Sequence, residues 1–391
     1  MATGPRSSRL DSIDLVRGLA MVLMAIDHVR VYSGVPAGGP TPGVFFTRWV
    51  THFVAPAFVF LAGTAIFLHA RRLNGRTALA RFLVLRGLWL VALELTVLRV
   101  AWTFNLAFDQ YLLAGVIWMI GWCMVAMAAI VFLPVELVGA FGVVVIAGHN
   151  LVDLFAGPIR AAFETTPPHW MLKVLYFGGA IRVGADGPPL LILFVILPWL
   201  AVMMTGYAFG RVMLWPVERR ACFCLRLGLT LAAAFVVLRY IDVYGDPRPW
   251  HESPIPVGLA FLNTTKYPAS LLFLLMTLGP VVAAVGLAER WRGRVAEWAI
   301  TFGRVPLFYY LLHIPLIHLA AMAVSVVREG HVDPWLFGNH PMAPPPVPEG
   351  YTWSLGLLYL VFAICVTLLY FPCRWFERER RERPAAWMAW L

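Results

Sequence analysis

The chain has 391 residues, of which 60% are hydrophobic and only 13% are charged, and its mean hydropathy is +0.76. This composition excludes a soluble globular domain, in which about 25% of the residues are charged. Apolar stretches of roughly 20 residues recur along the chain, and a helix of that length crosses a hydrocarbon core of roughly 30 Å. We therefore expect an all-α fold, a polytopic membrane helix bundle.

The basic residues do not indicate a nucleic-acid partner. The formal net charge is +10, but the arginines cluster between apolar stretches, where the positive-inside rule places them. The five cysteines form no CxxC pair, so we interpret them as packing residues and expect no metal. Nucleotide hydrolysis, zinc proteolysis and serine hydrolysis lack support, because the sequence contains no GxxxxGK, HExxH or GxSxG motif.

Ten membrane-spanning helices are predicted from the apolar stretches. They cover residues 12–32, 50–69, 79–100, 111–132, 135–156, 189–212, 222–243, 269–288, 299–325 and 353–373. The arginine-rich connections all fall on one side, which predicts that both termini are cytoplasmic. We interpret residues 1–391 as one integral-membrane domain, with a cytoplasmic N-terminus at 1–11 and a basic cytoplasmic tail at 374–391. The arginine-rich, nearly lysine-free composition favours a GC-rich bacterial genome and a bacterial inner membrane.

The first predicted span contains the stretch RGLAMVLMAIDH, residues 17–28, with three ionisable groups. Such groups are costly in a membrane unless they face the bundle interior or water, so they are candidates for a functional site. Arg17 and His28 are close to three helical turns apart and share one face, with a separation of roughly 16 Å along the axis. Asp14, Met21 and Met24 lie on the same face, and Asp14 is at pairing distance from Arg17.

We hypothesise that this face binds a coenzyme A thioester, because its length is comparable to an extended pantetheine arm. The phosphates would lie near Arg17, the arm would pass Met24, and a neutral His28 imidazole would deprotonate an attacking hydroxyl or amine. Simpler roles stay open, since Arg17 can snorkel to the interface and His28 can form a hydrogen bond between helices. Asp27 lies about 100° around the helix from His28, so we expect it to bond another helix or orient a neighbouring imidazole.

Several segments resemble one known family. RLDSIDLVRGLAMVLMAIDH followed by THFVAPAFVFLAGTAIF resembles the start of the catalytic domain of heparan-alpha-glucosaminide N-acetyltransferase and its bacterial relatives. Three later segments resemble the bacterial branch of that family: FLNTTKYPASLLFLLMTLGP, FGRVPLFYYLLHIPLIH and FPCRWFERERRER. The spacing of Arg17 and His28 also resembles the motif of bacterial integral-membrane O-acyltransferases that modify cell-surface glycans.

The resemblance implies a helix bundle that takes an acyl group from cytoplasmic acyl-CoA, most simply acetyl-CoA, and delivers it to a sugar on the far side. The implied partners are membrane lipid, acyl-CoA and an extracytoplasmic glycan or small sugar, and the sequence does not decide between a monomer and a homodimer. The animal enzyme is expected to use a loop histidine, but YSGVPAGGPTPGVFFTRW contains none. The catalytic imidazole is then expected to be His28, His52 or another residue.

Further candidates lie in other spans and in the outer loops. His52, at the outer end of the second span, is the second choice for an acid or base, and His313 is a candidate for contact with substrate. Lys266, one of two lysines, lies in an outer loop where a cation would hold an anionic acceptor or the thioester oxygen. Hydrogen-bonding side chains suited to sugar hydroxyls lie beside it, at Asn263, Thr264 and Tyr267.

Two charged residues lie inside the third predicted span. Arg86 is deep enough to be costly against lipid, so we expect it to bind coenzyme phosphates together with Arg17. Glu94 is expected to form a structural ion pair with Arg99 or with a histidine.

The sequence therefore predicts a membrane acyltransferase that uses acyl-CoA to acylate an amine or hydroxyl of an extracytoplasmic sugar. The competing hypothesis is a proton-coupled transporter or flippase. In that case four residues would form a proton relay: Asp27, His28, Glu94 and His313. A scaffold subunit of a glycan-assembly complex is a third alternative.

Overall fold

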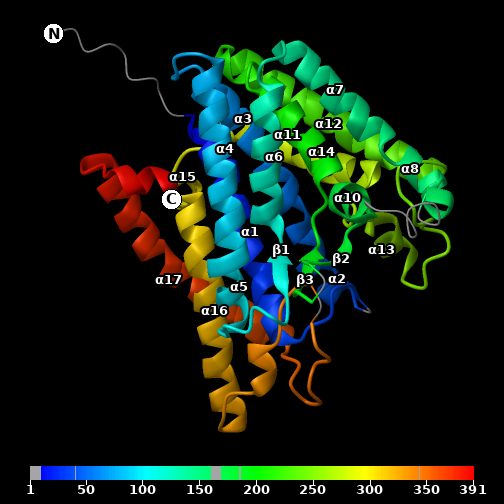
Figure 1. Cartoon of the computed structure of the whole chain (residues 1–391), viewed down its shortest axis with the longest axis vertical. Helices are drawn as coiled ribbons and strands as arrows, with labels where there is room; N and C mark the ends of the chain where they lie inside the picture. The colour runs from blue at the N-terminus through cyan, green and yellow to red at the C-terminus, as the bar shows by residue number, and fades with distance from the viewer. Residues whose placement is uncertain (1–9, 40, 160–168, 185, 343) are drawn as a thin grey trace.

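The computed structural model describes residues 10–39, 41–159, 169–184, 186–342 and 344–391, and these residues are mostly helical (Figure 1). The helices are α1 (Asp11–Ser33), α2 (Pro42–Trp49), α3 (Val54–Ala70), α4 (Arg76–Leu93), α5 (Arg99–Thr103), α6 (Val116–Ile130), α7 (Val135–Gly148), α8 (Leu151–Leu154), α10 (His169–Leu172), α11 (Ile196–Phe209), α12 (Val217–Ile241), α13 (Val257–Leu262), α14 (Leu271–Ala288), α15 (Arg294–Arg304), α16 (Pro306–Glu329) and α17 (Leu355–Glu382). Short 3-10 and π segments extend several of them; η1 (Val50–Phe53) joins α2 to α3, and the π-helix η2 (Glu94–Leu98) joins α4 to α5.

Seven helical segments in the described part of the chain are long and apolar enough to cross a membrane. They are Pro42–Ala70, Val135–Leu154, Ile196–Leu214, Val217–Ile241, Leu271–Ala288, Pro306–Glu329 and Leu355–Glu382. This agrees with a multi-pass membrane protein. The predicted number of ten is not reached by length and composition, because α1 and α4 carry several charged residues and α6 has only 15 residues.

The predicted span at 299–325 is two helices. The chain leaves α15 at Val305 and starts α16 at Pro306, which occupies the first turn. Proline has no backbone N–H to continue the helix that precedes it, but it is tolerated at a helix start. The break leaves α15 as an amphipathic helix against α1.

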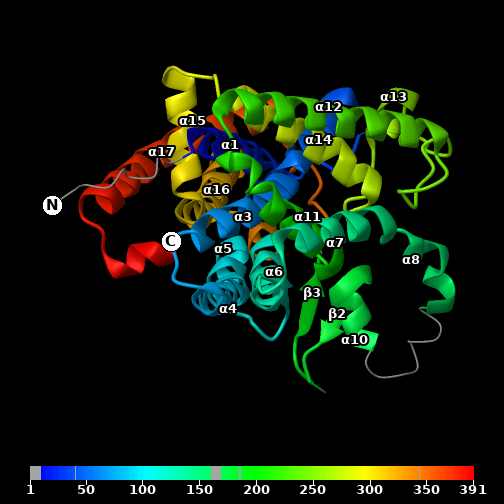
Figure 2. The same ribbon diagram turned by 90° about the horizontal axis from the view of Figure 1, so that it is seen from above.

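Helix α1 is the central element of the fold. It packs against α3, α14, α15, α16 and α17, as the view from above shows (Figure 2). The contact with α15 brings backbones together: a Cβ on Gly18 would lie 1.8 Å from the Ala299 carbonyl oxygen, and one on Gly303 would lie 1.8 Å from the Asp14 carbonyl oxygen. Only glycine at these two positions allows so close an approach.

The structure adds a small sheet that the all-α expectation missed. Strands β1 (Leu112–Ala114), β2 (Gly179–Arg182) and β3 (Pro189–Ile192) form it in the order β1-β3-β2. β1 pairs with β3 in parallel, with Leu112 opposite Leu190, and β2 pairs with β3 in antiparallel. Short apolar runs such as LLA and PLLI cannot be distinguished from the ends of membrane helices by periodicity, which is why they were included in predicted spans.

The start of α1 and the end of α17 lie at the same end of the bundle. Arg304 at the end of α15 pairs with Asp11 at 3.0 Å and with Glu377 at 2.5 Å. Which side of the membrane this end faces stays a prediction. Most of the predicted N-terminal segment 1–11 lies outside the described residues.

Candidate active site

An inner cavity of about 80 Å³ lies beside the C-terminal half of α1. Its walls come from α1, from the α2–α3 segment, from η2, from the sheet region and from α16. The ionisable and polar lining residues are Asp27, His28, Thr51, Glu94, Lys266, Tyr267 and Tyr310, with Met24 and Trp102 among the apolar ones.

A larger outer cavity of about 370 Å³ adjoins it. The lining combines the start of the α2–α3 segment with the loop between α13 and α14. It includes Arg48, His52, Arg248, Asn263, Thr264, Thr265, Lys266 and Tyr267. Lys266 and Tyr267 line both cavities, so they mark the boundary between them.

The two cavities bring together most of the predicted site, although its members are distant in sequence. The inner cavity collects Met24, Asp27 and His28. The outer cavity collects the second-choice base and the predicted sugar contacts: His52, Lys266, Asn263, Thr264 and Tyr267. The proposed coenzyme residues Arg17, Asp14 and Arg86 line neither cavity.

His28 and His313 form a hydrogen-bonded pair. Nδ1 of His28 lies 2.6 Å from Nε2 of His313, and the ring planes are 21° apart with centroids 4.7 Å apart. Atoms of two rings stacked face to face stay roughly 3.5 Å apart because of van der Waals contact. The 2.6 Å between the two nitrogens is shorter, so the nitrogens face each other at the ring edges, as in a hydrogen bond. Trp102 packs edge-on against His28, at 4.8 Å between centroids, and fixes the ring further.

A backbone carbonyl sets the tautomers of this pair. Nδ1 of His313 lies 2.7 Å from the carbonyl oxygen of Tyr310, which only accepts, so Nδ1 of His313 carries the proton. Nε2 of His313 therefore accepts from Nδ1–H of His28 in the neutral pair. Nε2 of His28 is then the unprotonated nitrogen, and His28 lines the inner cavity.

His313 was predicted as a substrate contact, but its position differs. The side chain is fully buried and lies behind His28, outside the described lining of both cavities. It contacts His28 through the hydrogen bond between the two rings.

Asp27 forms its ion pair within its own helix, in contrast to the expectation of a bond to another helix or to an imidazole. Its Oδ1 accepts from Nε of Arg30 at 2.8 Å, and Arg30 also donates to the Val35 carbonyl oxygen. The i, i+3 spacing brings these two side chains to the same helix surface. Asp27 still lines the inner cavity, with its charge balanced by Arg30.

The predicted pairing of Glu94 with Arg99 or a histidine is wrong. Oε2 of Glu94 accepts from the backbone N–H groups of Ile117 and Trp118, at 2.8 and 3.1 Å. These donors belong to the first turn of α6, whose unpaired N–H groups and positive dipole end stabilise an anion. Arg99 donates to other oxygens, among them the side chain of Asn105.

The backbone brings Glu94 to that position. Glu94 is the first residue of the π-helix η2 and directly follows the last residue of α4, Leu93. Gly115 precedes α6, and a Cβ there would lie 2.7 Å from Oε1 of Glu94. A side chain at residue 115 would therefore force the Glu94 carboxylate to shift from its present position.

Lys266 is a largely buried cation at the boundary of the cavities. Only 9% of the residue is exposed, and its Nζ lies 5.3 Å from the ring centroid of Tyr267 and 5.9 Å from that of Phe194. Within the described part of the chain, no carboxylate lies within ion-pair distance of this ammonium. Aromatic faces partly compensate for its lost hydration.

The N-terminal half of α1 is closed by α15. Arg17 donates to Oδ1 of Asp14 at 3.4 Å, which confirms the predicted pairing, and to the Gly303 carbonyl oxygen at 3.0 Å. Gly18 and Gly303 leave no space between the two backbones. A donor lying along this face would need α1 and α15 to separate.

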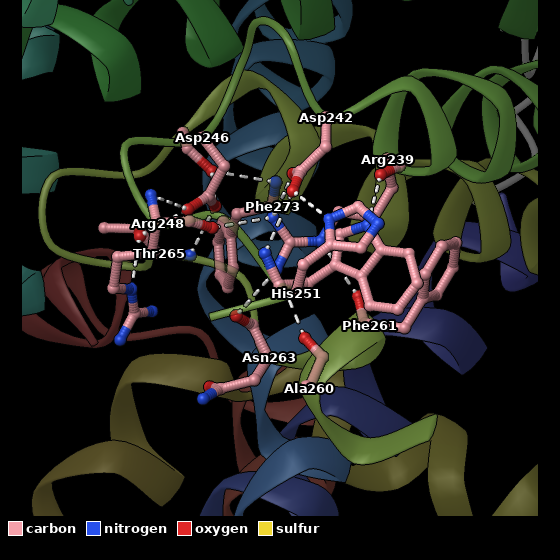
Figure 3. A network of polar contacts seen from close by, with 12 residues as sticks. Arg239, Asp242, Asp246, Arg248, His251, Ala260, Phe261, Asn263, Thr265 and Phe273 are labelled. Atoms are coloured by element: carbon pink, nitrogen blue, oxygen red, sulfur yellow. Dashed lines mark hydrogen bonds and ion pairs between the residues drawn. The ribbon is translucent and has the colours of Figure 1, made fainter. Parts of the chain in front are cut away.

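A buried polar network supports the outer cavity (Figure 3). Arg239, only 1% exposed, donates to the carbonyl oxygens of Arg248, Ala260 and Phe261. Asp246 accepts from the backbone and hydroxyl of Thr265, at 2.7 and 2.8 Å, and from Ser270. The segment that carries Lys266 is thereby tied to the end of α12.

Several residues of this region were missed by sequence reasoning. From the sequence, Arg48 and Arg248 look like ordinary charges at the membrane interface. No local pattern shows that these two residues, 200 positions apart, line the same cavity. Arg30 had a usable signal, because it is three residues from Asp27 on a helix. Arg239 lies near the end of a span, where a basic residue is usually assigned to the interface.

The family described as heparan-alpha-glucosaminide N-acetyltransferase, catalytic, matches residues 9–238, and no curated protein matches the chain. The match covers the helices that hold Asp27, His28, His52 and Glu94. With more than half of its length matched, the chain belongs to the heparan-alpha-glucosaminide N-acetyltransferase catalytic family, a family of membrane acetyltransferases that use acetyl-CoA as donor.

Proposed function

We propose that this protein transfers an acetyl group from cytoplasmic acetyl-CoA, or another acyl group from its acyl-CoA, to an amine or hydroxyl of an extracytoplasmic sugar or glycan. Its location would be the bacterial inner membrane. The observation that carries the proposal is the His28–His313 pair, because the tautomers leave Nε2 of His28 as a base at the inner cavity. Family membership supports the type of reaction.

In the proposed reaction Nε2 of His28 removes the proton of the acceptor amine or hydroxyl as it attacks the thioester carbonyl. The new C–N or C–O bond gives a tetrahedral oxyanion, which the ammonium of Lys266, a lining residue of the inner cavity, would stabilise. The carbonyl re-forms, the C–S bond breaks, and the proton on His28 passes to the coenzyme thiolate. His313 holds the imidazolium through a charge-assisted hydrogen bond.

The other proposed roles follow the position of each residue. Arg17, with Asp14 to orient it, and Arg86 would bind the phosphates of the donor at the cytoplasmic end, and Met24 would contact the pantetheine arm. The Gly18–Gly303 contact implies that donor binding rearranges α1 against α15. On the other side, His52, Asn263, Thr264 and Tyr267 would shape the acceptor site.

The test is acyl transfer by purified protein with radiolabelled acetyl-CoA and a panel of amino sugars. His28→Ala removes the base, and a loss of at least about 100-fold in kcat is expected from the size of general-base contributions. His28→Asn keeps a donor toward His313 without a base, so it should fold normally and be equally inactive. His69→Ala, at the far end of α3 and outside both cavities, is the matched control. Near wild-type transfer by His28→Ala would refute the assignment.

The same assay separates the enzyme from a transporter or flippase. An acyltransferase releases free CoA and an acylated sugar, whereas a transporter leaves the thioester intact. A scaffold subunit would neither bind nor consume the coenzyme.

A further inference from the structure

Tyr310 lines the inner cavity but takes no part in the proton transfers of the proposed reaction. It lies on α16, one turn before His313, and only 3% of the residue is exposed. Its ring meets the ring of His313 edge-on, at 5.1 Å between centroids, and the ring of His28 in the same way at 6.4 Å. Edge-to-face contacts are favourable between about 4.5 and 7 Å, so the two histidines hold the phenol ring beside the base.

The hydroxyl of Tyr310 is a hydrogen-bond donor without a partner. In the described part of the chain it forms no hydrogen bond, although the carbonyl oxygen of the same residue accepts from His313. The hydroxyl of the adjacent Tyr309 is also unpartnered, but it is sealed in the core and lines neither cavity. A phenol has an ordinary pKa of about 10 and keeps its proton near neutral pH. Because Tyr310 lines the inner cavity, its O–H can donate to a group that enters there.

Three other polar groups of the inner cavity are unsuited to this role. Asp27 and Glu94 only accept when they are ionised, and each is already engaged, Asp27 by an arginine of its own helix and Glu94 by the first turn of α6. The hydroxyl of Thr51 donates to a backbone carbonyl oxygen at 2.7 Å. The ammonium of Lys266 and the hydroxyl of Tyr310 can instead donate to a negative charge that forms in this cavity.

The size of the inner cavity brings these donors close to the reacting atoms. A volume of about 80 Å³ holds only a few water molecules. A thioester carbonyl that lies within reach of Nε2 of His28 therefore also lies close to the other lining groups. An oxyanion formed at that carbonyl shares the same small volume with the Tyr310 side chain.

We infer that the Tyr310 hydroxyl is a catalytic hydrogen-bond donor, which stabilises the tetrahedral oxyanion together with Lys266. This inference rests on the proposed acyl transfer. When the acceptor nitrogen or oxygen bonds to the thioester carbon, the π electron pair of the carbonyl moves onto its oxygen, and the O–H of Tyr310 donates to that oxygen without losing its proton. When the carbonyl re-forms and the C–S bond breaks, this hydrogen bond weakens and the thiolate takes the proton held by His28. A ring that is fixed before the reaction is effective in this role, because the donor need not reorganise as the charge forms.

The experiment measures acetyl transfer by Tyr310→Phe, which removes the hydroxyl and keeps the ring. The backbone carbonyl that sets the tautomer of His313 stays, so the base at His28 is unchanged. Loss of one oxyanion donor is expected to lower kcat by about 100-fold or more. KM for acetyl-CoA should stay nearly the same, because the interaction strengthens only as the charge forms.

Tyr309→Phe is the matched control, because it removes a hydroxyl from the adjacent residue, outside both cavities. It is expected to keep the wild-type kcat, and both variants should keep the wild-type midpoint of thermal unfolding. Wild-type kcat in Tyr310→Phe would overturn the inference. An equal loss of kcat in the two variants would also overturn it, since the effect would then come from packing and not from a donor in the cavity.

A tetrahedral analogue keeps this test separate from that of the proposed function. The methylphosphonyl thioester of coenzyme A carries a stable anionic oxygen where the oxyanion would form, and its binding needs no acceptor. If no sugar is acylated, calorimetric titration with this analogue decides. Saturable binding that is about tenfold weaker in Tyr310→Phe than in Tyr309→Phe supports the donor, as for the loss of one hydrogen bond to a charged group. Equal affinity of the two variants, or no saturable binding by the wild type, overturns the inference.

Discussion

His340 is a buried histidine outside the membrane spans, in the loop that follows α16. Its ring stacks on Tyr111, with centroids 4.1 Å apart and planes 15° apart. Burial, with a smaller effect from the nearby Arg99 cation, lowers the pKa of His340 from 6.5 to about 4. The folded protein therefore keeps this imidazole neutral where the unfolded chain would protonate it.

This difference predicts an acid-sensitive stability. Above pH 6.5 His340 is neutral in both states, and as the pH falls from 6.5 to 4 only the unfolded state gains the proton, so the free energy of unfolding decreases. The expected loss is up to about 3 kcal/mol, from about 1.4 kcal/mol per pKa unit. Thermal unfolding in detergent should depend less on pH in His340→Gln than in the wild type. The exposed His331→Gln is the control, and equal pH profiles for all three proteins would contradict the prediction.

For single residues, the sequence identified the ionisable side chains of the site better than it identified their hydrogen-bond partners. The shared helix face predicted the Asp14–Arg17 pair, because that contact is local. The partners of His28 and Glu94 are His313 and the first turn of α6, which no local pattern reveals. A bond between residues that are 285 positions apart depends on the packing of whole helices.

The contact between α1 and α15 is the closest helix pair in the region of the candidate site. A Cβ on Gly303 would overlap the Asp14 carbonyl oxygen, and backbone atoms cannot move aside as a side chain can. Gly303→Ala is therefore expected to destabilise the fold by about 1–3 kcal/mol, the usual cost of overpacking. Gly148→Ala is the matched control, because a Cβ at the end of α7 would meet open space. The midpoint of thermal unfolding measures both, and an unchanged midpoint in Gly303→Ala would contradict the close contact.

Helices were predicted correctly where a long apolar stretch indicates them. Elements whose structure depends on contacts with distant parts of the chain were missed. Each predicted apolar stretch contains a helix, for example α14 in 269–288, although two of the stretches also include a strand. Strands β1 and β3 were included in predicted spans because a short apolar run, such as the four residues of β3, has the composition of a helix end. The division of 299–325 at Val305 was missed although Pro306 carries the signal, since proline also occurs within the helices α14, α16 and α17.

The sequence predicts on which side of the membrane the two termini lie, and helix packing supports one part of that prediction, namely that both lie on the same side. Arg304 forms ion pairs with Asp11 at the start of α1 and with Glu377 near the end of α17. These two helix ends therefore lie on the same side of the bundle. The arginine-rich connections predict the cytoplasm.

Protease-cleavable epitope tags test this orientation in intact cells. Tags at both termini should be protected from added protease, and a tag inserted at residues 253–255, in the loop between α12 and α13, should be cleaved. Cleavage at only one terminus would contradict the shared side, and cleavage at both would reverse the orientation.

The boundary formed by Lys266 and Tyr267 has one more consequence. The two cavities adjoin there, so a sugar that fills the outer cavity also covers the inner one. The bound acceptor would then close the inner cavity to solvent. It would displace water from the space beside His28, so that the thioester reacts with the sugar and is not hydrolysed. Selection of the right nucleophile would follow from the order in which the two cavities fill.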